Sequence, residues 1–170
     1  MMDLSEWFSM QLNASAEGFL WAVEQVPVER RLVTPPAGLG EWNVPRHAFH
    51  MASYEQHVAL PSMQLWVGEP RSLTDIEFDD DVAWEEGMAL EPILQDFRAV
   101  RAEQILLLQH YKEETWEEKR TTVWGDVTLK WVVTKTYQHT CEHTHDVLRL
   151  ALFWDGYQRR QEQQEKQAQK

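Results

Sequence analysis

Apolar residues recur at intervals of three and four along several long stretches of the chain, a pattern typical of amphipathic α-helices. In residues 4–26 the stripe includes Phe8, Leu12, Phe19 and Val23. We therefore expect a first helix over this range. The next residues, 26–42, contain three prolines and two glycines, which predicts a connector.

A second helix is expected to begin at Asn43, because an asparagine side chain can cap a helix and Pro45 falls in its first turn. The apolar pattern continues past Pro61, where we expect a kink or a boundary. Residues 70–90 are strongly acidic but lack the aspartate and glycine spacing of an EF-hand calcium loop. They are predicted to form a long exposed loop.

A third helix is predicted over residues 91–116 and a fourth from Leu129 past Trp154, with an extended link at residues 121–128. The predicted fold class is all-α, a four-helix bundle of antiparallel type. The long loop between the second and third helices leaves the connectivity open. Residues 1–156 are expected to form one domain, and residues 157–170 a polar tail that is either an exposed helix extension or frayed.

The charge balance narrows the possible partners. The chain has 170 residues, with 28 acidic and 16 basic side chains and a formal net charge of −12. Such a surface repels phosphate groups, so neither nucleic acid nor an anionic membrane is an expected partner. We see no signal peptide or membrane-spanning run and expect a cytoplasmic protein. A single cysteine, Cys141, excludes an intrachain disulfide and a zinc site with several cysteines.

Three histidines close together in the fourth predicted helix suggest metal chemistry. His139 and His143 are four residues apart and continue an inner stripe that includes Thr136 and Val147. His145 points about 200° away from His143 around the helix. An inward pair of this spacing can hold one ion. Alternatively, the two rings could hydrogen-bond to each other, to Thr136 or to buried water.

The second predicted helix offers candidates for a third ligand. His47 and His50 lie near its start, and His57 follows two turns after His50 on the same face. Two turns correspond to about 10 Å along the helix axis, so only one of His50 and His57 can join a compact site. The spacing does not decide which.

Two motifs of the chain resemble those of the DinB/YfiT-like family of metalloenzymes. Trp42 is followed eight residues later by His50, and His139 and His143 are followed by Asp146. The resemblance implies a four-helix bundle with a divalent metal held by His50, His139 and His143. Asn43 and Asp146 replace the serine and glutamine common in the family, which leaves the substrate open.

The resemblance also implies a chemistry. Zinc or nickel is the expected metal, with iron or cobalt possible, and a three-histidine site leaves a coordination position open. Some characterised relatives in the family are S-transferases that use low-molecular-weight thiols, and some are mycothiol-dependent maleylpyruvate isomerases. We therefore expect a metal-dependent S-transferase that activates a small thiol for attack on an electrophile. The alternatives are a metal-dependent hydrolase that uses bound hydroxide, and a non-enzymatic, stress-associated metal-binding protein. A homodimer is also implied.

The remaining polar residues receive weaker roles. Asp146, Glu142 and Tyr54 are candidates for catalytic residues, because each lies near a presumed ligand in helical phase or sequence. His47 and His57 are expected to line a pocket or lie on the surface. His110 and His145 are expected to be solvated, and Cys141 to point away from the metal without acting as a nucleophile.

Overall fold

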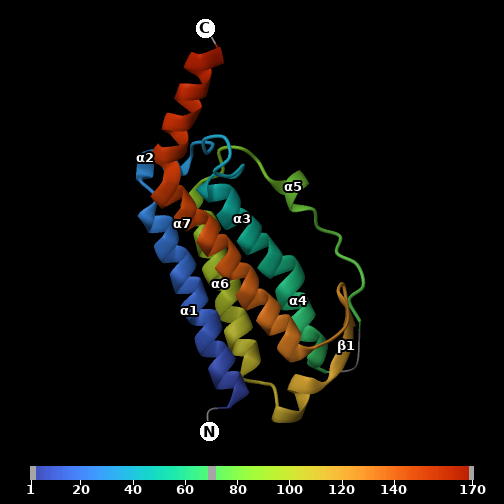
Figure 1. Cartoon of the computed structure of the whole chain (residues 1–170). Coiled ribbons are helices and arrows are strands. Elements are labelled where there is room, and N and C mark those ends of the chain that lie inside the picture. Colours follow the sequence, from blue (N-terminus) through green and yellow to red (C-terminus); the bar gives the residue numbers. More distant parts are fainter. Residues whose placement is uncertain (1–2, 69–71, 169–170) are drawn as a thin grey trace.

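The computed structural model describes residues 3–68 and 72–168, and within them four long helical segments pack side by side as a bundle (Figure 1). The segments are α1 (Leu4–Gln25), the segment that starts with α3 (Val44–Tyr54), α6 (Leu90–Leu108) and α7 (Leu129–Ala168). The predicted all-α four-helix bundle is therefore confirmed. The first helix has nearly the predicted bounds and is capped by Asp3, whose carboxylate accepts from the Ser5 amide.

The second long helix starts as predicted and changes its winding near Pro61. The Asn43 side chain accepts from the Arg46 amide at 3.0 Å, and Pro45 lies in the first turn. After α3 the backbone continues as a π-helix, η1 (Glu55–Ala59), then as α4 (Leu60–Met63) and the 3₁₀ turn η2 (Gln64–Trp66). Because Pro61 has no amide hydrogen, it cannot complete an α-helical bond to His57, and the widened turn accommodates this loss.

The third helix was predicted too long. It ends at Leu108, and Trp116 belongs to a separate 3₁₀ segment, η3 (Glu113–Glu117). The chain turns because Tyr111 and Trp116 are both drawn into a buried cluster at that end of the bundle, where Trp116 stacks on Phe8 at 5.0 Å. Tertiary packing thus overrides a helical pattern that continues in the sequence.

The link at residues 121–128 is a β-hairpin rather than a simple extended segment. Strands β1 (Lys119–Thr122) and β2 (Gly125–Thr128) pair antiparallel, with Lys119 opposite Thr128. Gly125 has a φ of +87°, a conformation that glycine adopts without strain at a tight turn. The connector before α3 likewise contains one short helix that the sequence pattern did not predict, α2 (Val28–Arg31).

A buried ion pair joins all four helical segments. The Arg101 guanidinium on α6 donates to both carboxylate oxygens of Glu55 in η1, and both side chains are almost inaccessible to water. It also donates to the Leu12 carbonyl and Ser15 hydroxyl on α1, and to the Thr140 hydroxyl on α7. This network fixes the position of α7 relative to α3, and so the spacing of the side chains that both helices direct inward.

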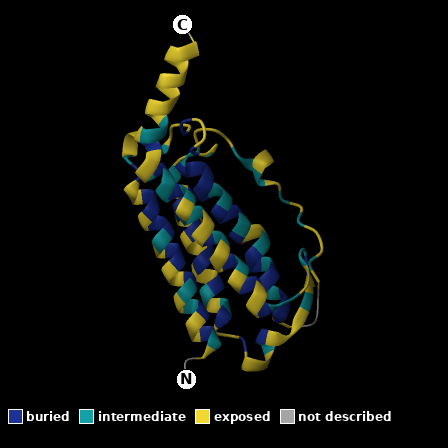
Figure 2. Ribbon diagram, in the orientation of Figure 1, coloured by how far each residue is buried: buried dark blue, intermediate teal, exposed yellow. Residues whose placement is uncertain are grey.

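Segments outside the bundle differ in how they pack. The acidic region forms only one short helix, α5 (Asp80–Ala83), between residues 72 and 89, and positions 70 and 71 of the predicted loop lie outside the described residues. The C-terminal part of α7 projects beyond the bundle, and residues 158–168 are exposed (Figure 2). None of the helices described in the structure has the length and apolar character needed to cross a membrane.

Candidate metal centre

Three imidazole rings meet where α3 packs against α7. His50 comes from α3, and His139 and His143 come from successive turns of α7. One ring nitrogen from each histidine can be chosen so that all three lie within 4.8 Å of one another. The Nε2 atoms of His50 and His139 are 3.2 Å apart. The structure therefore brings together the three histidines singled out in the sequence, while His57 lies elsewhere, exposed and stacked on Phe78.

The acidic segment orients His50. Asp80 Oδ2 lies 2.5 Å from His50 Nδ1, and a hydrogen on Nδ1 leaves the Nε2 lone pair free to face His139. Burial raises the pKa of Asp80, but the hydrogen bond from His50 and the nearby charge of Arg46 outweigh that effect and hold the pKa below its usual value. Asp80 is thus a carboxylate anion that accepts a hydrogen bond from Nδ1 of His50.

Arg46 docks the acidic segment on α3. Its buried guanidinium donates to Asp80 at 3.1 Å and to Asp81. The same group lies 4.6 Å from the centre of the Trp42 ring and 5.5 Å from that of Trp84. Asp80 and Arg46 were both missed by sequence reasoning. The sequence signals for this pair are an arginine one helical turn before His50 and a run of three aspartates at residues 79–81. Nothing in the sequence connects the two.

His47 supports His143 in a similar way. Their Nδ1 atoms are 3.0 Å apart, so one ring donates to the other. Burial, and then the neighbouring His143 and His50 rings, lower the pKa of His47 to about 3. His47 was expected to line a pocket or lie on the surface. It does line a cavity, and it is also buried against a candidate ligand.

Two of the three candidate ligands, His139 and His143, are held in the neutral form. Burial first, and neighbouring imidazoles second, lower the pKa of His139 to about 3 and that of His143 to about 4. Neutral imidazole is the form that binds a metal. The Nδ1 atom of His139 is buried without a hydrogen-bond partner in the described structure, and the Tyr54 ring lies 4.0 Å from the His139 ring. Closely spaced and incompletely paired ring nitrogens fit a divalent cation.

The proposed catalytic candidates lie in different places. An Asp146 oxygen and one nitrogen each from His47 and His143 lie within 4.8 Å of one another, so Asp146 borders the cluster. Tyr54 contacts His139, and burial raises its pKa, so the phenol is protonated at neutral pH. Glu142 instead lies on the exposed face of α7 and accepts from Gln138.

The remaining polar candidates are outside the cluster. Cys141 and His145 are exposed and line a shallow groove between α7 and α1. His110 is exposed just after α6. These placements agree with the expectations from helical phase for Cys141 and His145, and from the charged neighbours for His110.

A cavity of about 410 Å³ opens beside the histidines. His47 and His143 line one wall and the Trp42 ring stacks nearly parallel to His143, with ring centres 5.9 Å apart. Glu41, Asp146 and Arg149 supply its polar rim, and the side chains of Asp146 and Arg149 are 3.8 Å apart. The volume falls in the range that accommodates a small organic molecule.

Helical architecture and histidine geometry together define a bundle protein with a candidate metal centre between two of its helices. The sequence then assigns the family: residues 11–147 match the DinB superfamily, and the chain belongs to that superfamily. No curated protein gives a significant match.

Two solved structures are similar in fold. One is YfiT from Bacillus subtilis, described as a probable metal-dependent hydrolase with an unusual four-helix bundle topology, with 16% identity, a TM-score of 0.72 and 89% of each chain covered. The other is a conserved protein from Enterococcus faecalis, with 17% identity, a TM-score of 0.65, and 92% of this chain and 99% of the other covered. At such low identities the likeness establishes the fold alone.

Proposed function

We propose that the protein is a metal-dependent S-transferase in which His50, His139 and His143 hold a divalent ion, zinc or nickel in the first instance and iron or cobalt as alternatives. The observation that carries this proposal is the meeting of three imidazoles, two of which are kept neutral by burial, beside a cavity large enough for a substrate. Three protein ligands leave room for a further ligand, as in catalytic rather than structural sites. When bound, the ion supplies Lewis acidity that lowers the pKa of a coordinated thiol or water molecule.

The protein side chains supply orientation and proton transfer. Asp80 holds the Nδ1 hydrogen of His50, and His47 fixes the ring of His143. The Asp146 side chain borders the cavity, and its carboxyl oxygens are the candidate acceptor for the proton that the thiol loses. The sulfur then donates an electron pair to the electrophilic carbon, a carbon–sulfur bond forms, and the leaving group departs with the electrons of its former bond.

The cavity rim suits a small thiol that also carries a carboxylate. Arg149 contributes the positive charge at the rim, beside the acidic Glu41 and Asp146, and its ion pair with Asp146 is loose and partly exposed. An incoming carboxylate can compete for that guanidinium and form paired hydrogen bonds with it. Cysteine and glutathione both have this combination of groups and are suitable test substrates.

Hydrolysis is the second candidate, because the similar YfiT structure is described as that of a probable metal-dependent hydrolase. The same carboxylate, Asp146, would accept a proton from water instead of from a thiol. The two reactions differ in one requirement. Conjugation needs an added thiol, whereas hydrolysis of an ester proceeds without one.

Metal analysis and two activity assays test these functions. Purified protein is analysed for metals, then assayed for conjugation of cysteine or glutathione to 1-chloro-2,4-dinitrobenzene and for hydrolysis of 4-nitrophenyl acetate. His139→Ala should lose both metal and conjugation, whereas His145→Ala, on the exposed face of the same helix, should retain both. Conjugation absent from the metal-loaded protein would reject the transferase, and ester turnover without thiol would favour the hydrolase.

A non-enzymatic role and a dimer remain to be tested with the same material. If the purified protein contains no metal and its thermal stability is unchanged by a chelator, the stress-associated binding role replaces the enzyme. We also propose a homodimer, which light scattering tests directly.

A further inference from the structure

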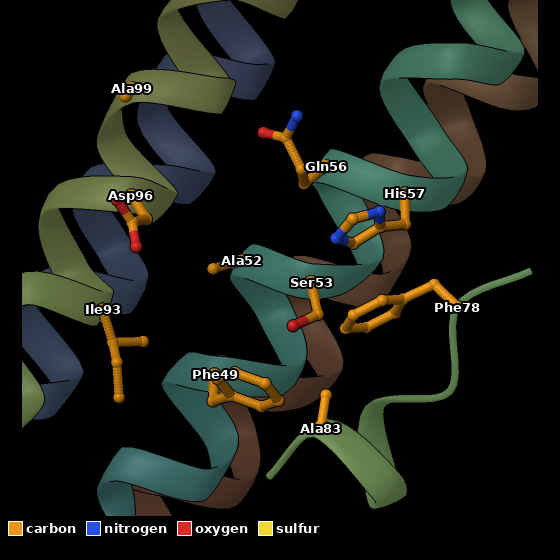
Figure 3. A pocket seen from close by; sticks show the side chains of 10 residues that line it. All are labelled: Phe49, Ala52, Ser53, Gln56, His57, Phe78, Ala83, Ile93, Asp96 and Ala99. Atoms are coloured by element: carbon orange, nitrogen blue, oxygen red, sulfur yellow. The ribbon is translucent and has the colours of Figure 1, made fainter. Parts of the chain in front are cut away.

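A second cavity lies on another face of α3. It has a volume of about 450 Å³ and is enclosed by α3 and η1, by α6, and by the segment that carries Phe78 and α5 (Figure 3). Phe49 and Ser53 line this cavity. The residue that follows each of them lies at the histidine cluster: His50 is a member of it, and Tyr54 contacts His139. Because consecutive helical residues are rotated by about 100°, the cavity and the cluster occupy different sides of the same helix.

The walls of this cavity are aromatic and aliphatic. The Phe78 ring is stacked on the His57 ring, with centres 3.8 Å apart and planes 9° apart. Phe49 packs against Trp84, with ring centres 5.4 Å apart. Small aliphatic side chains complete the lining: Ala52, Ala83, Ile93 and Ala99. Rings held in place by other rings form a preorganised slot for a flat apolar group.

Asp96 is the only charged side chain among the lining residues. Burial lowers the pKa of His57, so its ring is neutral at neutral pH and does not balance that carboxylate. Asp96 has no hydrogen bond or ion pair with any residue that the structure describes, and it faces the cavity from α6 (Figure 3). The Ser53 hydroxyl points into the same space from α3. The Gln56 carboxamide also lines the cavity, so its polar groups offer the negative charge of the exposed Asp96 together with neutral hydrogen-bond donors and acceptors.

We propose that this cavity is a binding site for a small aromatic amine in its protonated form. The aromatic ring occupies the slot between Phe49 and Phe78, and the ammonium group pairs with Asp96 and donates to Ser53. The excess of acidic residues over the whole chain also favours the approach of a cation. This site does not depend on the metal-dependent function proposed above.

Calorimetric titration with two matched ligands tests the charge requirement on the unaltered protein. Phenethylamine carries a phenyl ring and an ammonium group, and 3-phenylpropionate carries the same ring on a similar chain with a carboxylate. We expect phenethylamine to bind at least about tenfold more tightly, which corresponds to about 1.4 kcal/mol. Failure of phenethylamine to bind, or equal binding of the two ligands, would overturn the proposal.

Two variants then locate the site. Asp96→Asn should weaken phenethylamine binding about tenfold, whereas Glu103→Gln, which removes one charge from the exposed surface of the same helix outside the cavity, should leave it unchanged. Ala99→Phe should fill the cavity and abolish binding without changing the metal content. If Asp96→Asn and Glu103→Gln have equal effects, or if Ala99→Phe binds phenethylamine normally, the ligand binds elsewhere and the proposal is wrong.

Discussion

The contact between Asp80 and His50 gives the sharpest test of the metal centre. Replacing Asp80 with asparagine keeps the shape of the side chain but removes the charge that accepts the His50 Nδ1 hydrogen at 2.5 Å. The Nε2 lone pair then loses both its orientation and part of its basicity. Carboxylates in this position typically contribute 10- to 100-fold to metal affinity, so we expect Asp80→Asn to cost about 1.4–2.7 kcal/mol of binding free energy.

Asp81 supplies the matched control. It also bonds to Arg46, but its side chain is 81% exposed, against 25% for Asp80, and it has no contact with a histidine. Zinc affinity is measured by competition with a chromophoric chelator, after circular dichroism has shown that both variants are folded. Asp81→Asn should stay within about threefold of the unaltered protein.

Two results would refute this reasoning. If both asparagine variants lose affinity equally, the acidic segment acts only through its attachment to Arg46. If neither loses affinity, the orientation of His50 does not depend on Asp80.

Three further predictions concern stability. The metal-free protein should lose stability as the pH falls from about 6.5 to 4. The cause is that His47, His139 and His143 bind protons in this range when the chain is unfolded, whereas burial lowers their pKa values in the folded state. The free energy of unfolding measured in urea should therefore be lower at pH 5 than at pH 7, by roughly 2 kcal/mol for each of these rings. Constant stability across that range would show that the rings are protonated in the folded state. Arg101→Met should cost about 3–5 kcal/mol in the same assay, since it leaves Glu55 buried without its partner, and the double variant with Glu55→Met should recover part of that loss. Truncation after Glu162, which removes the exposed residues 163–168 together with the last two positions, should change the free energy of unfolding by less than about 0.5 kcal/mol. A larger loss would indicate that this end of α7 is packed.

Local patterns in the sequence were sufficient to predict the four long helices and the direction in which several side chains point. Asn43 and Pro45 mark the start of α3 because capping depends on neighbouring backbone groups alone. Helical phase likewise separated His139 and His143 from the exposed His145. Local rules failed where distant contacts intervened, as at Trp116, which leaves the helical pattern to join Phe8 in the core.

The composition of the site was decided by tertiary structure. Periodicity gives the face on which a residue lies, but no distance between residues on different elements. It therefore left His50 and His57 as equal candidates and gave no reason to connect the acidic segment with a histidine. Only the packing of α3 against α7 brings His50 to His139, and only the docking of α5 on Arg46 brings Asp80 to His50. The sequence by itself determined which side chains face inward, and the three-dimensional fold determined which of them meet.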